Sequence, residues 1–278
     1  MKKIQRLFSL SRPRFWLYEL GPYAIGVLAG ALQVADLQDW RIFVFAVFFL
    51  FPANLYIYGI NDIFDYETDK LNPKKQGYED LLEPKLHAFV WKAIGLMTLP
   101  FLFFLDWSNG SQIFWFLLFL FFAGFYSAEP IRAKTKSFLD GFFSAGHYVA
   151  TAVFGYVLVS GGDIAWQYVI AGVLRAMAMH AYSAIPDIQA DREAHMNTVA
   201  TVLEKNWTLV YCLILYGLAA ILVFTFLGWV SLVLGAVYAA MMIASFFTDD
   251  LMKLYRYFPW LNSLVGMILF FVVALVHL

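Results

Sequence analysis

Residues 42–69 read IFVFAVFFLFPANLYIYGINDIFDYETD, and this stretch decides the fold. Its first part, 42–60, is mainly apolar and as long as a transmembrane helix, which needs about 20 such residues. Three carboxylates follow at once, those of Asp62, Asp65 and Asp69. Acidic side chains are costly at membrane depth and usually mark a functional site there. The stretch therefore predicts a membrane protein with a functional site at one end of a helix.

Composition extends this prediction to the whole chain. Of the 278 residues, 62% are hydrophobic and only 14% are charged, where soluble domains average about 25% charged residues. A soluble protein of this composition would expose too much apolar surface, so we expect the lipid bilayer to be its solvent. The net charge of −1 does not support a nucleic-acid partner. The only cysteine, Cys212, excludes an internal disulfide and a thiolate metal cluster.

Eight further segments resemble 42–60 in length and hydropathy. The nine predicted spans are 15–34, 42–60, 88–105, 112–128, 138–160, 164–186, 208–228, 229–247 and 259–278. With no alternating strand pattern and no long polar stretch, they predict an all-α membrane protein in which residues 1–278 form one domain. The basic, amphipathic segment KKIQRLFSLSRPRFW at 2–16 is expected to form a cytoplasmic interfacial helix and not a cleaved signal peptide.

The distribution of positive charge orients these spans. Seventeen of the 19 lysine and arginine residues fall at the N-terminus or after even-numbered spans, and only Arg41 lies in an opposite loop. Cytoplasmic loops carry an excess of Lys and Arg. We therefore expect a multi-pass protein of the cell (inner) membrane with a cytoplasmic N-terminus and an external C-terminus. The predicted cytoplasmic segments are 61–80, 129–137, 187–206 and 248–257.

The carboxylates after the second span share one face if the helix continues through them. Asp62, Asp65 and Asp69 are spaced i, i+3 and i+7. The same polar stripe extends toward the middle of the membrane through Asn54, Tyr58 and Asn61. This pattern predicts a polar surface that faces other helices and not lipid.

A second acidic group ends the sixth span. Asp187 and Asp191 are spaced i and i+4, and His180 and Ser183 lie on the same stripe. Both groups fall at predicted cytoplasmic ends, so they can face each other across one vestibule. Five converging carboxylates repel one another, and divalent cations relieve this repulsion. Mg²⁺ takes one or two carboxylates and completes its shell with water and phosphate oxygens, so we predict Mg²⁺ sites that hold a diphosphate.

A third element follows the fourth span, in the sequence YSAEPIRAK at 126–134. Arg132 and Lys134 lie on the same predicted face as the two acidic groups. Their positive charge can bind phosphate oxygens as negative charge develops on a leaving group. They also fit ordinary anchoring by the positive-inside rule, so their position beside the acidic groups carries the functional interpretation.

These three elements, in this order, resemble those of the UbiA superfamily of intramembrane prenyltransferases. Asn61, Asp62, Asp65 and Asp69 resemble its first aspartate motif, and Asp187 and Asp191 resemble part of its second. Tyr126, Pro130, Arg132 and Lys134 resemble its YxxxPxRxK element. The resemblance implies nine helices around a central cavity, with the aspartate motifs under a cytoplasmic cap. One position departs from the family pattern, because Ser183 stands where many members carry a further aspartate.

The resemblance also implies roles for these residues. It places Mg²⁺ on Asp62, Asp65, Asp69, Asp187 and Asp191. It assigns catalysis to Asp62, Asp65, Arg132 and Lys134. Substrate contacts are expected from Asn54, Tyr58, Asn61, Tyr126, Arg132, Lys134, His180 and Ser183. The second site has fewer carboxylates than usual, so both one and two Mg²⁺ ions remain open.

Two segments resemble one branch of the superfamily more than the others. NDIFDYETDKLNPKK at 61–75 and HAYSAIPDIQADRE at 180–193 are most similar to the lycopene elongase branch. This implies an allylic diphosphate donor, most simply dimethylallyl diphosphate, and lycopene as the lipophilic acceptor on the way to C50 carotenoids. The cation formed on an alkene acceptor then loses a proton or captures water, and the sequence leaves both routes open.

Alternatives also remain at this stage. The acceptor could be an aromatic or quinone precursor or another lipid. An ion-coupled transporter would also use intramembrane carboxylates, although here they cluster at one face and not at the midplane. Arg175, in the middle of the sixth span, could pair with Glu19, Asp140 or substrate phosphate, or lock two helices together.

Overall fold

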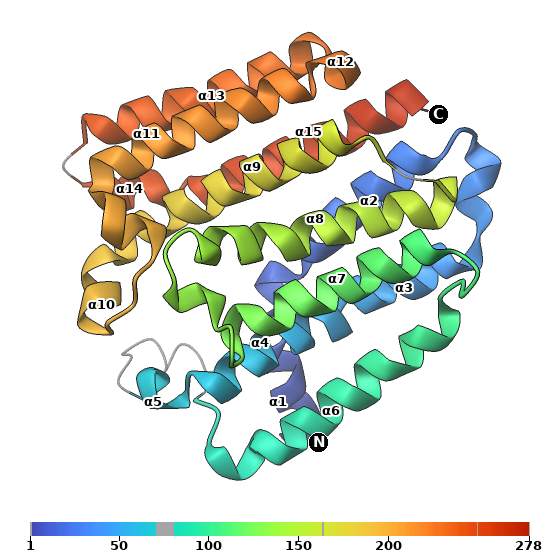
Figure 1. Ribbon diagram of the computed structural model, residues 1–278, viewed down its shortest axis with the longest axis horizontal. Coiled ribbons are helices and arrows are strands. Elements are labelled where there is room, and N and C mark those ends of the chain that lie inside the picture. Colours follow the sequence, from blue (N-terminus) through green and yellow to red (C-terminus); the bar gives the residue numbers. More distant parts are fainter. Residues whose placement is uncertain (1, 71–80, 163, 249, 278) are drawn as a thin grey trace.

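The computed structural model describes residues 2–70, 81–162, 164–248 and 250–277, and these ranges contain helices and no strand. The all-α prediction is therefore confirmed. Most helices lie roughly parallel or antiparallel in a single bundle (Figure 1). Of the segment 61–75, which resembles the lycopene elongase branch, residues 71–75 lie outside the described residues.

The chain forms fifteen α-helices within the described ranges. They are α1 (Lys2–Leu10), α2 (Trp16–Gly30), α3 (Trp40–Leu50), α4 (Pro52–Phe64), α5 (Tyr66–Asp69), α6 (His87–Thr98), α7 (Gly110–Ser127), α8 (Leu139–Ser160), α9 (Trp166–Ala184), α10 (Ile188–Glu193), α11 (Val199–Leu222), α12 (Phe224–Leu227), α13 (Trp229–Phe246), α14 (Leu251–Tyr255) and α15 (Phe258–His277). The short helices α1, α5, α10, α12 and α14 connect or flank the long ones.

Eight helical stretches of the described chain are long and apolar enough to cross a membrane, one fewer than predicted. They match the second to ninth predicted spans. The first predicted span, 15–34, corresponds to α2, which has only 15 residues and contains Glu19. A helix of this length extends about 22 Å, less than the roughly 30 Å hydrocarbon core. Helix α2 is thus the short ninth member of the bundle, and the 3₁₀ turn Pro13–Phe15 precedes it.

The loops separate into two ends, as the charge distribution predicted. Helices α5, α10 and α14 lie at one end of the bundle and α12 lies at the other (Figure 1). At the α12 end, four exposed tryptophans stand at or just before the starts of membrane helices: Trp40, Trp107, Trp166 and Trp229. Tryptophan is enriched where a membrane meets water. These residues are placed to form one interfacial belt.

Two helices break where a continuous helix was expected. Helix α4 ends at Phe64, and Asp65 separates it from α5. Helix α9 ends at Ala184, and Pro186 lies in the 3₁₀ turn Ile185–Asp187 that leads into α10. The expected face shared by Asp62, Asp65 and Asp69, and the one shared by His180 and Asp187, is therefore interrupted. Each break turns the chain within its acidic motif.

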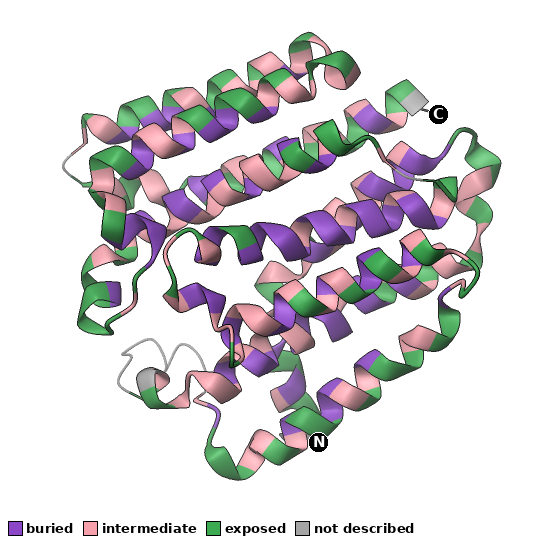
Figure 2. Cartoon of the chain, in the orientation of Figure 1, coloured by how far each residue is buried: buried purple, intermediate pink, exposed green. Residues whose placement is uncertain are grey.

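Aromatic side chains fill one core of the bundle. Phe45, Phe48, Phe116 and Phe154 are fully buried and pack ring against ring between α3, α7 and α8. Figure 2 shows α8 as the most continuously buried helix, in the middle of the bundle. Its central position makes α8 the element against which the site is built.

Helices α2 and α8 approach each other very closely. A Cβ atom on Gly26 would lie 1.8 Å from the carbonyl oxygen of Ala152, and one on Gly155 would lie 2.5 Å from that of Tyr23. Only glycine permits this backbone contact, which is typical of helix packing in membranes. The contact places the polar residues of α2 directly against α8.

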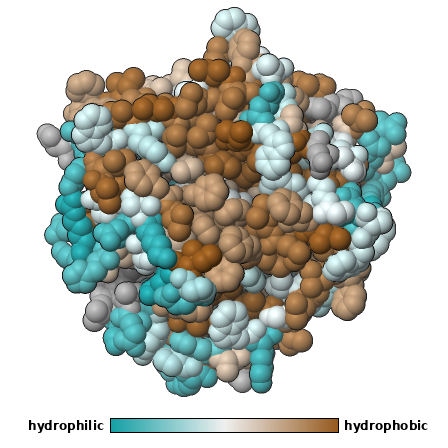
Figure 3. Space-filling view, in the orientation of Figure 1, coloured by the Kyte–Doolittle hydropathy of each residue, from teal (hydrophilic) through white to brown (hydrophobic). Residues whose placement is uncertain are grey.

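The outer surface fits a lipid environment. Figure 3 shows hydrophobic residues across the middle of one face, with hydrophilic residues gathered toward its left and right ends. Large apolar side chains stand exposed on the outer surface of the protein, including Phe43, Leu96, Phe103 and Trp207. In water such a surface would drive association, whereas in a bilayer it contacts acyl chains.

Candidate active site

The first aspartate motif is held by a residue from the N-terminal segment. Asp62 is buried near the end of α4, and Arg12 Nη2 donates to its Oδ1 at 2.9 Å. The Arg12 guanidinium also lies 4.6 Å from the centre of the Tyr58 ring. Arg12 adopts a left-handed backbone conformation, with φ of 49°, between α1 and the turn that leads into α2. The N-terminal segment thus covers the end of α4.

The third sequence element reaches the same motif. Arg132 Nη2 lies 3.5 Å from Asp65 Oδ1, and Lys134 forms an ion pair with Asp65 Oδ2. Lys134 is 91% buried, and this burial lowers the pKa of its ammonium group, although the Asp65 carboxylate opposes the shift. The predicted meeting of the YxxxPxRxK element with the first aspartate motif is present in the structure.

The second motif has different surroundings. Asp191, in α10, is buried and accepts a hydrogen bond from Thr198 Oγ1 at 3.3 Å. Nearby, Asp140 Oδ2 accepts a hydrogen bond from the backbone N–H of Val199 at 3.0 Å and lies 3.5 Å from His180 Nε2. Asp140 is completely buried in the first turn of α8.

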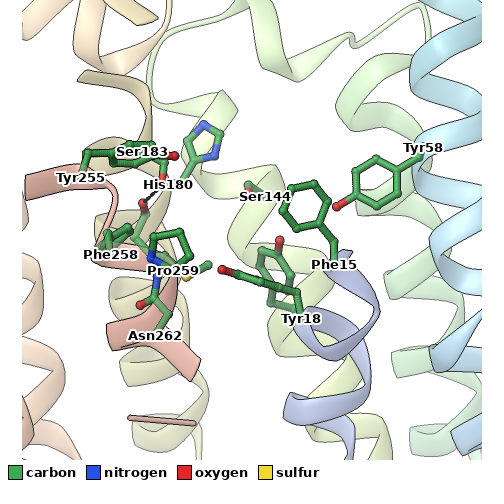
Figure 4. Close-up of a pocket in the computed structure, with 12 residues that line it drawn as sticks. Phe15, Tyr18, Tyr58, Ser144, His180, Ser183, Tyr255, Phe258, Pro259 and Asn262 are labelled. Atoms are coloured by element: carbon green, nitrogen blue, oxygen red, sulfur yellow. Dashed lines mark hydrogen bonds between the residues drawn. The ribbon is translucent and has the colours of Figure 1, made fainter. Parts of the chain in front are cut away.

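A cavity of about 230 Å³ lies between helices that carry the two motifs. Tyr58 lies one turn before Asp62, and Ser183 lies one turn before Asp187. The lining residues are Phe15, Tyr18, Tyr58, Ser144, Tyr148, Met179, His180, Ser183, Tyr255, Phe258, Pro259 and Asn262. Figure 4 shows their side chains converging from the turn Pro13–Phe15 and from α2, α4, α8, α9, α14 and α15. We call this space the reaction cavity.

Of the eight predicted substrate contacts, four line or border this cavity, and the other four, including the Arg132 and Lys134 described above, lie outside it. Tyr58, His180 and Ser183 line it. The Tyr126 ring is not among the lining residues, but its centre lies 6.1 Å from that of His180. Asn54 donates to the carbonyl oxygens of Phe49 and Leu50, where it supports the break between α3 and α4. Asn61 donates to Ser127 Oγ and thereby ties α4 to α7.

The donor set of these motifs fits Mg²⁺. In the described ranges, no three acidic, histidine or cysteine side chains converge as a cage made of protein alone would require. Mg²⁺ does not require such a cage, because it takes one or two carboxylates together with water and phosphate oxygens. Asp62 and Asp65 lie within one turn at the end of α4. Asp187 immediately precedes α10, and Asp191 lies in the first turn of that helix. Each pair offers oxygen ligands of the required kind.

Sequence reasoning missed three parts of this site: Arg12, the Phe15–Tyr18 wall of the cavity, and Asp140. Arg12 belongs to a basic N-terminus that membrane anchoring already explained. Asp140, an acid inside a predicted apolar span, was a signal that could have been followed.

The structure shows which of the expected contacts Arg175 makes. Its Nη2 donates to the Tyr238 hydroxyl at 2.9 Å, and that hydroxyl donates to Asn262 Oδ1 at 2.8 Å. This chain links α9, α13 and α15. Arg175 therefore locks helices together, at the edge of a second, mainly apolar cavity of about 540 Å³.

Comparison with known proteins places this geometry in context. The sequence matches the profile of the UbiA prenyltransferase family over residues 20–253. It is 39% identical over 271 residues to a lycopene elongase/hydratase of Halobacterium salinarum, covering 94% of each chain. The fold resembles that of a UbiA homologue from Aeropyrum pernix K1, with a TM-score of 0.71 and 20% identity over 96% of this chain and 99% of the other. A UbiA homologue from Archaeoglobus fulgidus bound to DMAPP and Mg²⁺ gives a TM-score of 0.68 at 17% identity, over 97% and 99% of the two chains.

Proposed function

The chain belongs to the UbiA prenyltransferase family, and from this premise we propose that it transfers a five-carbon group from dimethylallyl diphosphate to the ends of lycopene. The product would be a precursor of C50 carotenoids. Similarity along 94% of both chains to a lycopene elongase/hydratase carries this proposal. The polyene is far longer than the reaction cavity, so only its end would enter and the remainder would stay in the bilayer.

The size of the reaction cavity supports a short donor. A cavity of about 150 Å³ holds one benzene molecule. The 230 Å³ of the reaction cavity therefore suit a five-carbon group together with one end of an acceptor. A prenyl chain several times longer would need additional space.

The residues of the site divide the chemistry between them. Asp62, Asp65, Asp69, Asp187 and Asp191 would hold Mg²⁺, which when bound neutralises the diphosphate and improves it as a leaving group. Arg132 and Lys134 form ion pairs with Asp65. From there, both can bind the oxygens of the diphosphate that Mg²⁺ would also bind. The aromatic rings of Phe15, Tyr18 and Tyr58 border the cavity and present faces that stabilise an allylic cation.

Expression in a lycopene-producing bacterium tests the proposal. We expect C45 and C50 carotenoids with the native chain and unchanged lycopene with Asp65→Asn. The purified protein should release diphosphate from dimethylallyl diphosphate with lycopene and Mg²⁺, and EDTA should stop this release. If lycopene is untouched while an aromatic acid is prenylated, the acceptor assignment is wrong although the family assignment stands.

A further inference from the structure

A second polar cluster lies in the bundle outside the aspartate motifs. His147 Nδ1 lies 2.8 Å from Glu19 Oε1, and the Thr151 hydroxyl lies 2.9 Å from Glu19 Oε2. Glu19 is 1% exposed, His147 5% and Thr151 0%. The cluster joins α2 to α8 at their close backbone contact, and the mechanism above does not use it.

Burial of the ionisable side chains of this cluster costs free energy, which suggests that the cluster has a function. Glu19 lies in the first turn of α2, where burial removes the hydration of its carboxylate. An ionisable side chain inside a membrane domain usually marks function. Helices α2 and α8 already pack through glycine. A Glu–His pair is therefore not needed to bring them together.

The cluster lies next to the wall of the reaction cavity, although Glu19 and His147 are not themselves lining residues. Tyr18 and Tyr148, the chain neighbours of Glu19 and His147, both line that cavity, and so does Ser144, one turn before His147. With Nδ1 directed at Glu19, the described side chains form no hydrogen bond with His147 Nε2. This nitrogen is a proton acceptor in that tautomer.

Its depth separates the cluster from the diphosphate end. Asp140 and His180 form their pair at the start of α8. His147 lies seven residues further along α8, or about 10 Å deeper at 1.5 Å per residue. The Glu19–His147 pair therefore lies deeper in the bundle than the Asp140–His180 pair. Bond formation moves positive charge from the donor carbon, beside the diphosphate, to the acceptor carbon.

We propose that the Glu19–His147 pair accepts the proton of the water molecule that captures the acceptor cation. This inference rests on the proposed function. The donor carbon–oxygen bond breaks and diphosphate leaves with the electron pair, and the acceptor alkene forms a carbon–carbon bond to the donor carbon. The tertiary cation left on the acceptor then bonds to the oxygen of water. One proton of that water passes to His147 Nε2 while Glu19 stabilises the imidazolium, and a tertiary alcohol results.

Without this pair, the acceptor cation can lose a proton instead of capturing water. The departing diphosphate is itself a base and can remove a proton from the carbon next to the cation, which gives an alkene. The ratio of alcohol to alkene end groups therefore reports on the pair. Both products come from the same cation, so the ratio does not depend on how much folded protein is present.

The test compares this ratio in two variants that keep the shape of the cluster. Glu19→Gln retains the oxygen that faces Thr151, and His147→Asn retains an amide donor near the Nδ1 position. The purified protein is given dimethylallyl diphosphate, lycopene and Mg²⁺, and the products are separated by mass. We expect the alcohol-to-alkene ratio to fall by about 10²-fold, the lower end of the usual contribution of a general base, while prenylated product continues to form.

Ser245→Ala is the matched control. Ser245 is fully buried and bonds to the Tyr182 hydroxyl at 3.0 Å, away from the reaction cavity. It should leave the ratio unchanged. A native ratio in His147→Asn, or loss of all prenylated product in both cluster variants, would overturn the inference. Native protein that makes only alkene ends would also overturn it while leaving the proposed function intact, and native protein that makes no prenylated carotenoid would overturn the proposed function itself.

Discussion

The two aspartate motifs lie at the same end of the bundle but balance their charge in different ways. In the first motif, Asp62 pairs with Arg12, and Asp65 pairs with Arg132 and Lys134. In the second, Asp191 is equally enclosed but receives a hydroxyl hydrogen bond from Thr198. No lysine or arginine of the described chain forms an ion pair with Asp191.

This difference indicates how the site assembles. The chain's own cations hold the first motif in place, so its carboxylates are positioned before any ligand arrives. Asp191 is a buried carboxylate with which the described lysine and arginine residues form no ion pair, which is unfavourable until a cation binds. We therefore expect the first motif to dominate catalysis and the second to depend more strongly on Mg²⁺.

The largest expected effect is on activity at the first motif. Asp65→Asn removes a proposed metal ligand and the carboxylate that positions Arg132 and Lys134. We expect kcat/KM for diphosphate release to fall by about 10³-fold, comparable to the loss of a main electrostatic group in other enzymes. Ser245→Ala serves as the control. If Asp65→Asn keeps near-native activity in Mg²⁺, the carboxylate assignment is wrong.

The next largest expected difference is in the stability of the protein when one carboxylate of each motif is removed. Asp65→Asn leaves the buried Lys134 ammonium without its main partner, and breaking a buried ion pair costs about 3 kcal/mol at the lower end of the observed range. We expect a lower melting temperature in detergent, which the charge-balanced double variant Asp65→Asn/Lys134→Met restores. Asp191→Asn should not lower the melting temperature in the absence of Mg²⁺. Equal destabilisation by both single variants would remove the contrast.

The helices and the positions of both motifs were predictable because hydropathy and charge are local properties of the sequence. Residues 42–69 alone predict a span that ends in carboxylates, and the structure has that span at Trp40–Phe64. The positive residues separated the ends of the bundle correctly. The length of the first span departed from the prediction, because α2 runs only from Trp16 to Gly30 and is too short to cross the membrane without help.

The partners of the carboxylates were not predictable in the same way. Arg12 reaches Asp62 only because a left-handed residue turns the chain between α1 and α2. The expected continuous stripe through Asp65 fails because the helix breaks at that residue. The pairing of Glu19 with His147 depends on a close approach of α2 to α8, and spacing along the chain does not report such an approach. Expectations of simple like-charge repulsion therefore missed the ion pairs.

A smaller loss of activity is expected at the second motif. Asp191→Asn should lower kcat/KM by about 10²-fold, because the first motif still holds the diphosphate. The Mg²⁺ concentration for half-maximal activity should change more in Asp191→Asn than in any variant of the first motif that remains active. Titrating Mg²⁺ at fixed dimethylallyl diphosphate measures this. A loss as large as that of Asp65→Asn would mean that both motifs act as one unit, and the comparison would fail.

The smallest effect should come from adding charge where the family pattern has it. Ser183 lines the reaction cavity one turn before Asp187, and its hydroxyl donates to the Met179 carbonyl oxygen at 2.9 Å. That hydrogen bond stays within α9. Ser183→Asp adds a negative charge to the second motif. The attraction to a bound dication at a few ångströms is worth several kcal/mol at an effective dielectric constant of about 20. Desolvation of the new carboxylate offsets most of it.

We therefore expect the Mg²⁺ concentration for half-maximal activity to fall by about tenfold in Ser183→Asp, equivalent to about 1.4 kcal/mol. Ser183→Asn is the matched control, because it has nearly the same size and no charge, and it should leave this concentration unchanged. A fall in both variants would assign the effect to the shape of the cavity. An unchanged value in Ser183→Asp would mean that charge at the second motif does not limit metal binding. The asymmetry between the motifs would then reflect only how each is packed.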